Sequence, residues 1–157
     1  MQSNEHSFDE ISETFKKVAA TLRDGEIPYL LGGSLAFWAR GGPERRHDLD
    51  FMVKAEDAER ALDALADAGL RPERPPEGWL YKAWDGDVLV DLIFHPKGMA
   101  IDDDVIARGQ QREVLGMPVR VMALEDVLCT KLLALHEPTW TTRPCSRWRD
   151  RCARRST

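Results

Sequence analysis

Three aspartates are the residues of this chain whose types and spacing suit metal-assisted phosphate chemistry. Asp48 and Asp50 lie in the run HDLDFMV, and Asp91 interrupts the apolar run VLVDLIF. Side chains alternate along a β-strand, so Asp48 and Asp50 point to the same face, about 6.5 Å apart. A carboxylate among apolar neighbours needs a cation, and Mg²⁺ prefers carboxylate oxygens. We therefore predict that Asp48, Asp50 and Asp91 bind Mg²⁺. A solvated strand end and a hydrogen-bonded structural carboxylate are the alternatives.

A glycine turn upstream of these aspartates is a candidate phosphate-binding element. Gly32, Gly33 and Ser34 lie between a short apolar strand and the helical pattern SLAFWAR. Glycines let the backbone approach a ligand closely, and the free N–H groups and dipole of a helix start favour an anion. Ser34 either caps this helix or contacts phosphate. The turn alone is weak support, because glycine pairs before helices are common.

The elements that must position these residues alternate between strand and helix patterns. We predict helices at 8–22, 34–40, 55–68, 102–109 and 124–136. We also predict a hairpin or bent strand pair at 112–122 and single strands at 29–31, 48–53, 80–84 and 88–94. Asp85-Gly86 predicts a hairpin turn between the last two strands, and the proline-rich segment 71–78 predicts a loop. In the last helix we expect Leu124, Val127, Leu128, Leu132 and Leu135 on the inner face. The order favours an α/β (α+β) fold, a small mixed β-sheet flanked by helices, with the site at the sheet edge.

Charge and pattern divide the chain into a domain at 1–137 and an irregular or disordered basic tail at 138–157. The chain has 157 residues and a net charge of −5, and the tail holds six Arg and one Asp. Removing the +5 of the tail leaves −10 for residues 1–137. An acidic body disfavours extended nucleic-acid binding, so a small-molecule or protein partner fits better.

Other features exclude several classes of protein. The chain has no signal-type apolar core and no run of about 20 apolar residues, so we expect a cytoplasmic protein without a membrane partner. The three cysteines lack the spacing of a disulfide framework, and Cys129 is expected in the core. The four histidines lack ligand spacing, so no zinc is assigned.

The stretch LLGGSLAFWARGGPERRHDLDFMV, followed by VLVDLIF, resembles the nucleotidyltransferase superfamily. This superfamily is typified by DNA polymerase beta and the minimal nucleotidyltransferases, and it includes aminoglycoside-modifying and abortive-infection branches. Its members carry a glycine turn, an Asp-x-Asp strand and a third acidic residue on a neighbouring strand. The resemblance covers most of residues 28–136. The matching residues are Gly33, Ser34, Asp48, Asp50 and Asp91.

The resemblance implies a Mg²⁺-dependent enzyme that moves a nucleoside monophosphate from an NTP such as ATP to a hydroxyl acceptor. That acceptor is a small molecule, a protein or a tRNA end. The catalytic and metal-binding residues are then Asp48, Asp50 and Asp91, with two Mg²⁺ ions and Asp91 as general base. Nucleotide binding would fall to Gly32, Gly33, Ser34, Arg45, Arg46 and Lys131. The alternative for Arg45, Arg46 and Lys131 is simple solvation.

Two departures from the family pattern keep a second interpretation open. Many relatives carry Arg-x-Thr before the Asp-x-Asp, where this chain has residues 44–47, Glu-Arg-Arg-His. The tail also does not resemble the helices that close the cleft in relatives, so this part of the cleft is expected to be incomplete. The alternative is a catalytically degenerate member that binds a nucleotide or a partner, such as half of a toxin-antitoxin pair, and a homodimer is a further possibility.

Overall fold

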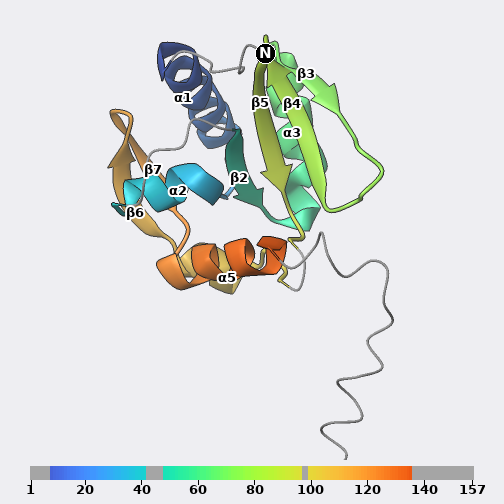
Figure 1. Cartoon of the computed structure of the whole chain (residues 1–157). Coiled ribbons are helices and arrows are strands. Elements are labelled where there is room, and N and C mark those ends of the chain that lie inside the picture. The colour runs from blue at the N-terminus through green and yellow to red at the C-terminus, as the bar shows by residue number, and fades with distance from the viewer. Residues whose placement is uncertain (1–7, 42–47, 97–98, 136–157) are drawn as a thin grey trace, which may run out of the picture.

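The computed structural model describes residues 8–41, 48–96 and 99–135, which form one mixed sheet with helices around it (Figure 1). The helices are α1 (Phe8–Asp24), α2 (Gly33–Ala39), the short 3₁₀ helix η1 (Ala55–Asp57), α3 (Ala58–Asp67), α4 (Asp103–Arg108) and α5 (Leu124–Leu135). The strands are β1 (Tyr29–Leu31), β2 (Leu49–Val53), β3 (Arg71–Glu73), β4 (Leu80–Asp85), β5 (Val88–Ile93), β6 (Gln110–Val114) and β7 (Met117–Val121). In the described residues, no helix is long and apolar enough to cross a bilayer.

The seven strands follow the order β3-β4-β5-β2-β1-β7-β6. β2 and β5 are parallel neighbours, and their register places Asp50 directly beside Asp91. β1 is antiparallel to β2, so the glycine turn that follows β1 lies next to the strand that carries Asp50. The predicted mixed fold is therefore confirmed. The expectation of a site at the sheet edge is wrong, because the hairpin β4–β5 and β3 extend the sheet beyond Asp91.

The core lies on the face of the sheet that α1 and α3 cover. Phe51 of β2 is fully buried and its ring stacks on that of Phe15 in α1, with 6.0 Å between the ring centroids. Figure 1 shows α3 behind β4 and β5. Because side chains alternate, Asp50 must point away from this core, to the face on which α2 and α5 lie. The same alternation that buries Phe51 thus presents Asp50 to the opposite face.

Two other local expectations need correction. Residues 71–73 form the edge strand β3 instead of a loop, because they pair with residues 82–84 of β4. The hairpin turn lies one residue later than predicted, since Asp85 pairs with Val88 and the two loop residues are 86 and 87. This shift sets which residue of β4 lies opposite Asp91.

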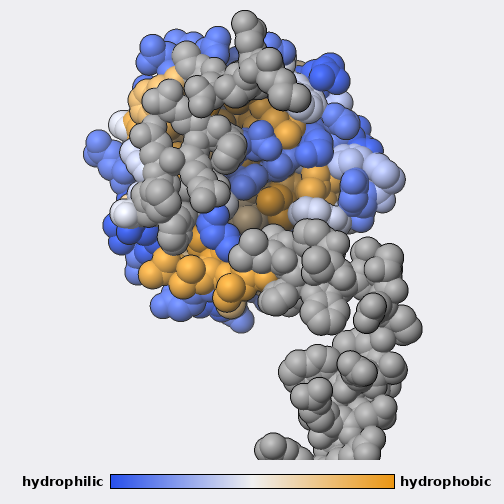
Figure 2. Space-filling view, viewed as in Figure 1, coloured by the Kyte–Doolittle hydropathy of each residue, from blue (hydrophilic) through white to orange (hydrophobic). Residues whose placement is uncertain are grey.

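Helix α5 also differs from its expected orientation. Val127 is fully buried, as predicted, whereas Leu124, Leu128 and Leu132, predicted on the same face, are 40%, 42% and 57% exposed. The side chain of Leu135 lies outside the described residues. Figure 2 shows the resulting apolar band along α5. Cys129 is exposed as well, so its assignment to the core was wrong. The period of apolar residues identified the helix, but a helix with apolar residues on several sides does not define its buried face.

Two arginines hold the helices that flank the site. Arg40, directly after α2, donates two hydrogen bonds to the carbonyl oxygen of Met122, at 3.1 and 2.8 Å. Arg108, at the end of α4, donates to both carboxylate oxygens of Asp126 in the first turn of α5, at 3.0 and 3.1 Å. Asp126 is only 8% exposed. This paired contact fixes α5 and, with it, the position of Lys131.

The substitution Arg108→Met is expected to lower the free energy of unfolding clearly, because Asp126 stays buried without its cation. Urea titration followed by circular dichroism measures this loss. The control is Arg23→Met, which removes an exposed pair with Asp24 and should change stability by less than about 0.5 kcal/mol. Equal effects of the two substitutions would contradict the anchoring role of Arg108.

Candidate functional site

The candidate site is centred on the side-by-side carboxyl groups of Asp50 and Asp91. Both residues are half-buried, and the register of β2 and β5 places them side by side. Two neighbouring carboxylates repel each other unless one of them holds a proton or a cation relieves their repulsion. The strand register alone therefore creates a place that needs positive charge.

The glycine turn packs directly against Asp50. The backbone N–H of Gly32 donates to the carbonyl oxygen of Asp50 at 2.9 Å. Gly33 has a φ of +61°, and a methyl group built on it would lie 2.7 Å from Cγ and 2.9 Å from Cβ of Asp50. These contacts involve the root of the side chain, so Asp50 could not rotate out of the way. Only glycine at position 33 permits this approach of turn and carboxyl group.

Lys82 is a member of the site that the sequence analysis missed. It lies opposite Asp91 in the antiparallel pair of β4 and β5, and its Nζ donates to Oδ1 of Asp91 at 3.1 Å. The side chains of Lys82 and Asp91 are 26% and 15% exposed, so this ion pair is partly removed from water. The register of the β4–β5 hairpin could have identified Lys82, because in this register the numbers of two paired residues add up to 173.

The electrostatics of the site follow from this crowding of carboxyl groups. Burial, and then the charges of Asp91 and Asp48, raise the pKa of Asp50 to about 7, against the opposing effect of Lys131 and Lys82. Burial also raises the pKa of Asp91, although the hydrogen bond from Lys82 acts in the other direction. At neutral pH, Asp50 is therefore present in both its neutral and its charged form.

The other predicted residues lie at different distances from this centre. Asp48 precedes β2 and is exposed, yet its charge acts on both Asp50 and Asp91. Lys131 of α5 is half-buried, and its charge acts on Asp50, so the structure brings it to the site. The backbone of Ser34 belongs to α2, but its side chain lies outside the described residues. Arg45 and Arg46 also lie outside them, so their assignment to the nucleotide stays a prediction.

The three aspartates do not form one metal-ligand group in the described part of the chain. There, no three side chains among His, Cys, Asp and Glu are grouped so that they could hold a metal ion. Asp50 and Asp91 instead contact each other, and Lys82 supplies the positive charge at Asp91. The chemistry of the donor set still fits Mg²⁺, since Asp50 and Asp91 offer neighbouring carboxylate oxygens and these are the ligands this ion prefers.

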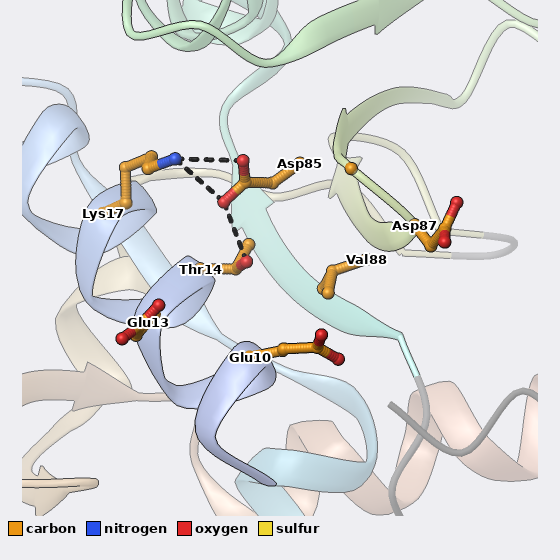
Figure 3. Close-up of a pocket in the computed structure, with 8 residues that line it drawn as sticks. Glu10, Glu13, Thr14, Lys17, Asp85, Asp87 and Val88 are labelled. Atoms are coloured by element: carbon orange, nitrogen blue, oxygen red, sulfur yellow. Dashed lines mark hydrogen bonds and ion pairs between the residues drawn. The ribbon is translucent and has the colours of Figure 1, made fainter. Parts of the chain in front are cut away.

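The surface has a hollow on the face of α2 and α5 and a separate pocket beside α1. Figure 2 shows a hollow, with hydrophilic residues around it and apolar ones within, in the face that carries α2 and α5. A pocket of about 420 Å³ lies between α1 and the β4–β5 turn (Figure 3). In it, Lys17 and Thr14 both point to the carboxylate of Asp85. Asp85 and Asp91 project from opposite faces of the sheet, so this pocket is separate from the candidate site.

The comparison with protein families identifies the chain. The family model of the aminoglycoside-2''-adenylyltransferases matches residues 14–119, which include Gly33, Asp50, Lys82 and Asp91. The chain belongs to this family. The predicted membership in the nucleotidyltransferase superfamily is thereby confirmed, as is the expectation that the chain belongs to a class of enzymes.

Solved structures support the same fold. The antibiotic-resistance factor ANT(2'')-Ia is 20% identical with a TM-score of 0.67, and the likeness covers 87% of this chain and 78% of that one. A predicted nucleotidyltransferase of Thermotoga maritima is 18% identical with a TM-score of 0.66, covering 82% and 87%. The lincosamide antibiotic adenylyltransferase LnuA is 15% identical with a TM-score of 0.55, covering 80% and 86%. At these identities the likeness shows a shared nucleotidyltransferase fold.

One curated protein is similar in sequence over a shared segment. Glutamate–tRNA ligase 1 of Sphingopyxis alaskensis is 30% identical over 109 residues, which are 68% of this chain and 20% of the ligase. The chain thus spans about a fifth of the length of that relative.

The first prediction for the site concerns Gly33. Gly33→Ala is expected to lower the free energy of unfolding by roughly 2–3 kcal/mol, because the new methyl group strains the backbone and displaces Asp50. Gly86→Ala is the matched control: its φ is +58° and a methyl group there meets nothing within 4 Å, so only about 1 kcal/mol of backbone strain is expected. Urea titration of both variants tests this. Equal losses would show that the turn does not pack on Asp50.

The second prediction concerns the pH dependence of stability. An ordinary aspartate in the unfolded chain loses its proton near pH 4, whereas Asp50 keeps its proton in the folded protein up to about pH 7. The folded state binds more protons between these values, so the contribution of Asp50 to stability falls as pH rises from about 4 to 7. Asp50→Asn should therefore raise Tm at pH 8, without added Mg²⁺, by several degrees more than at pH 5.

Thermal unfolding at pH 5 and pH 8 measures this difference. Asp67→Asn, at the exposed end of α3, is the control and should change Tm by the same small amount at both pH values. A Tm difference between the wild type and Asp50→Asn that does not grow with pH would contradict the raised pKa.

Proposed function

We propose that this chain is a Mg²⁺-dependent nucleotidyltransferase that moves a nucleoside monophosphate from an NTP to a hydroxyl group of a small-molecule acceptor. The observation that carries the proposal is the Asp50–Asp91 pair beside the glycine turn of Gly33. Phosphoryl transfer depends on the positioning of the reacting groups and on the stabilisation of negative charge. This arrangement brings two carboxylates next to a glycine turn whose backbone a phosphate group can approach closely.

Each residue has a role that follows from its position. The turn at Gly32 and Gly33 lets the triphosphate approach the backbone, since no Cβ shields it. Asp50 and Asp91, with Asp48 at the start of β2, would hold Mg²⁺ through their carboxylate oxygens. The bound Mg²⁺ would supply the positive charge that stabilises the attacking and leaving oxygens. Lys131 lies where its charge acts on Asp50, and it would add to the positive charge that faces the triphosphate.

The transfer itself is a displacement at the α-phosphorus. The acceptor hydroxyl oxygen forms a bond to this phosphorus, the bond to the bridging oxygen breaks, and pyrophosphate leaves. Asp91 is the proposed general base, because it lies on β5, on the side of Asp50 that faces away from the glycine turn. The proton of the acceptor hydroxyl would pass to its carboxylate.

An aminoglycoside is the acceptor that the family match supports best, with ATP as the nucleotide donor. The net charge of −10 on residues 1–137 also suits a ligand that carries several amino groups. Both ATP and an antibiotic that acts inside the cell would meet the enzyme in the cytoplasm, which is the proposed location. The adenylyltransferase LnuA shares the fold but acts on a lincosamide, so a different antibiotic class is the first alternative acceptor.

A second candidate is a member that binds a nucleotide or a partner protein without turnover. One observation favours it: Leu124, Leu128 and Leu132 of α5 expose an apolar band that a partner or a second copy of the chain could cover. Incubation with labelled nucleotide and Mg²⁺ separates the two candidates, because binding without transfer to any acceptor supports the second.

The prediction for activity concerns the three aspartates. Asp48→Asn, Asp50→Asn and Asp91→Asn are each expected to reduce transfer of labelled AMP from ATP to aminoglycosides on the order of a hundredfold or more, with the far-UV circular dichroism unchanged. Thin-layer separation of labelled product from ATP provides the measurement. Asp67→Asn should keep full activity. A variant of Asp50 or Asp91 with wild-type activity would defeat the assignment.

A further inference from the structure

Lys82 lies on the acceptor side of the candidate site. Reading across the sheet from the glycine turn, the residues come in the order Asp50 on β2, Asp91 on β5 and Lys82 on β4. Neighbouring strands are about 4.8 Å apart, so Lys82 is roughly two strand spacings from Asp50 and one from Asp91. It is therefore further from the triphosphate turn than either carboxylate.

The contact between Lys82 and Asp91 differs from an ordinary surface ion pair. Its N–O distance is 3.1 Å, and Asp50 lies beside Asp91 on the other side, on strand β2. The ammonium of Lys82 thus lies where a half-buried pair of acidic groups most needs positive charge. A Lys–Asp pair on the other face of the same hairpin, Lys17 with Asp85, is more exposed, at 43% and 23%.

We propose that Lys82 is a positioning residue whose ammonium takes the place of a cation beside Asp91 and holds that carboxylate on the acceptor side of the site. The inference rests on the proposed function for the role of Asp91. Its consequence is that a divalent cation and Lys82 compete for the same carboxylate oxygen. The flexible four-carbon stem of a lysine lets the ammonium withdraw when the cation binds, without any movement of β4.

This competition can be measured without catalysis. Thermal unfolding is recorded against MgCl₂ concentration, since a cation that binds the folded state raises Tm with a dependence set by its affinity. Lys82→Met should lower the Mg²⁺ concentration that gives half of the maximal shift by about three- to tenfold, because the competing charge is gone. Lys82→Gln keeps a hydrogen-bond donor without the charge, so it should show the same change even if the methionine variant folds poorly.

Two controls separate competition from a structural effect. Lys82→Arg keeps the charge and should remain within about twofold of the wild type. Lys17→Met removes the comparison pair on the other face, so it should lower Tm without changing the Mg²⁺ dependence. In an Asp91→Asn background, Lys82→Met should no longer change the Mg²⁺ dependence, because the contested oxygen has been replaced.

The outcomes are distinct from those that test the proposed function. If Lys82→Met and Lys82→Gln have the same half-saturating Mg²⁺ concentration as the wild type, or if Mg²⁺ changes no Tm, the proposal for Lys82 is overturned. If both variants shift as expected while the wild type transfers no nucleotide to any acceptor, the competition at Asp91 stands and the proposed activity fails.

Discussion

The structure of the candidate site depends on one constraint, the parallel pairing of β2 with β5 that sets the carboxyl groups of Asp50 and Asp91 side by side. Their neighbours in sequence, such as Phe51, point to the opposite face and are fully buried there. Burial of these apolar side chains therefore fixes the register, and the register holds two acidic groups together against their repulsion. Burial, and then the neighbouring charges of Asp91 and Asp48, raise the pKa of Asp50 to about 7.

The surrounding elements are arranged so that positive charge converges on this pair from two sides. Lys82 reaches Asp91 from β4, and the charge of Lys131 acts on Asp50 from α5. The glycine turn approaches Asp50 from β1, where any larger residue at position 33 would collide with the carboxyl group. The nucleoside triphosphate that we propose as substrate suits such a site, because it binds as its Mg²⁺ complex and brings its own cation to the carboxylates.

Much of the fold could be predicted from the sequence, because local patterns are strong where one face is buried. The strand 29–31, the hairpin and the helices were identified from periodicity and from turn residues. The buried face of α5 could not be predicted in full, because its leucines recur on more than one side of the helix. Only packing against the rest of the protein decides which of them are buried. Strand β3 was missed because its proline-rich sequence is typical of a loop, and an edge strand tolerates proline.

The candidate site shows how a small error in register hides a functional residue. A two-residue loop at Asp85-Gly86 would place Leu80 opposite Asp91, whereas the observed loop at 86–87 places Lys82 there. The alternation of side chains identified the carboxylates along single strands, but it carries no information on which residue faces them across the hairpin. That partner decides whether Asp91 lies beside an apolar group or an ammonium, and so whether its negative charge is balanced before any ligand binds. The charge balance of the site is thus set by the turn at residues 86–87, four residues before Asp91.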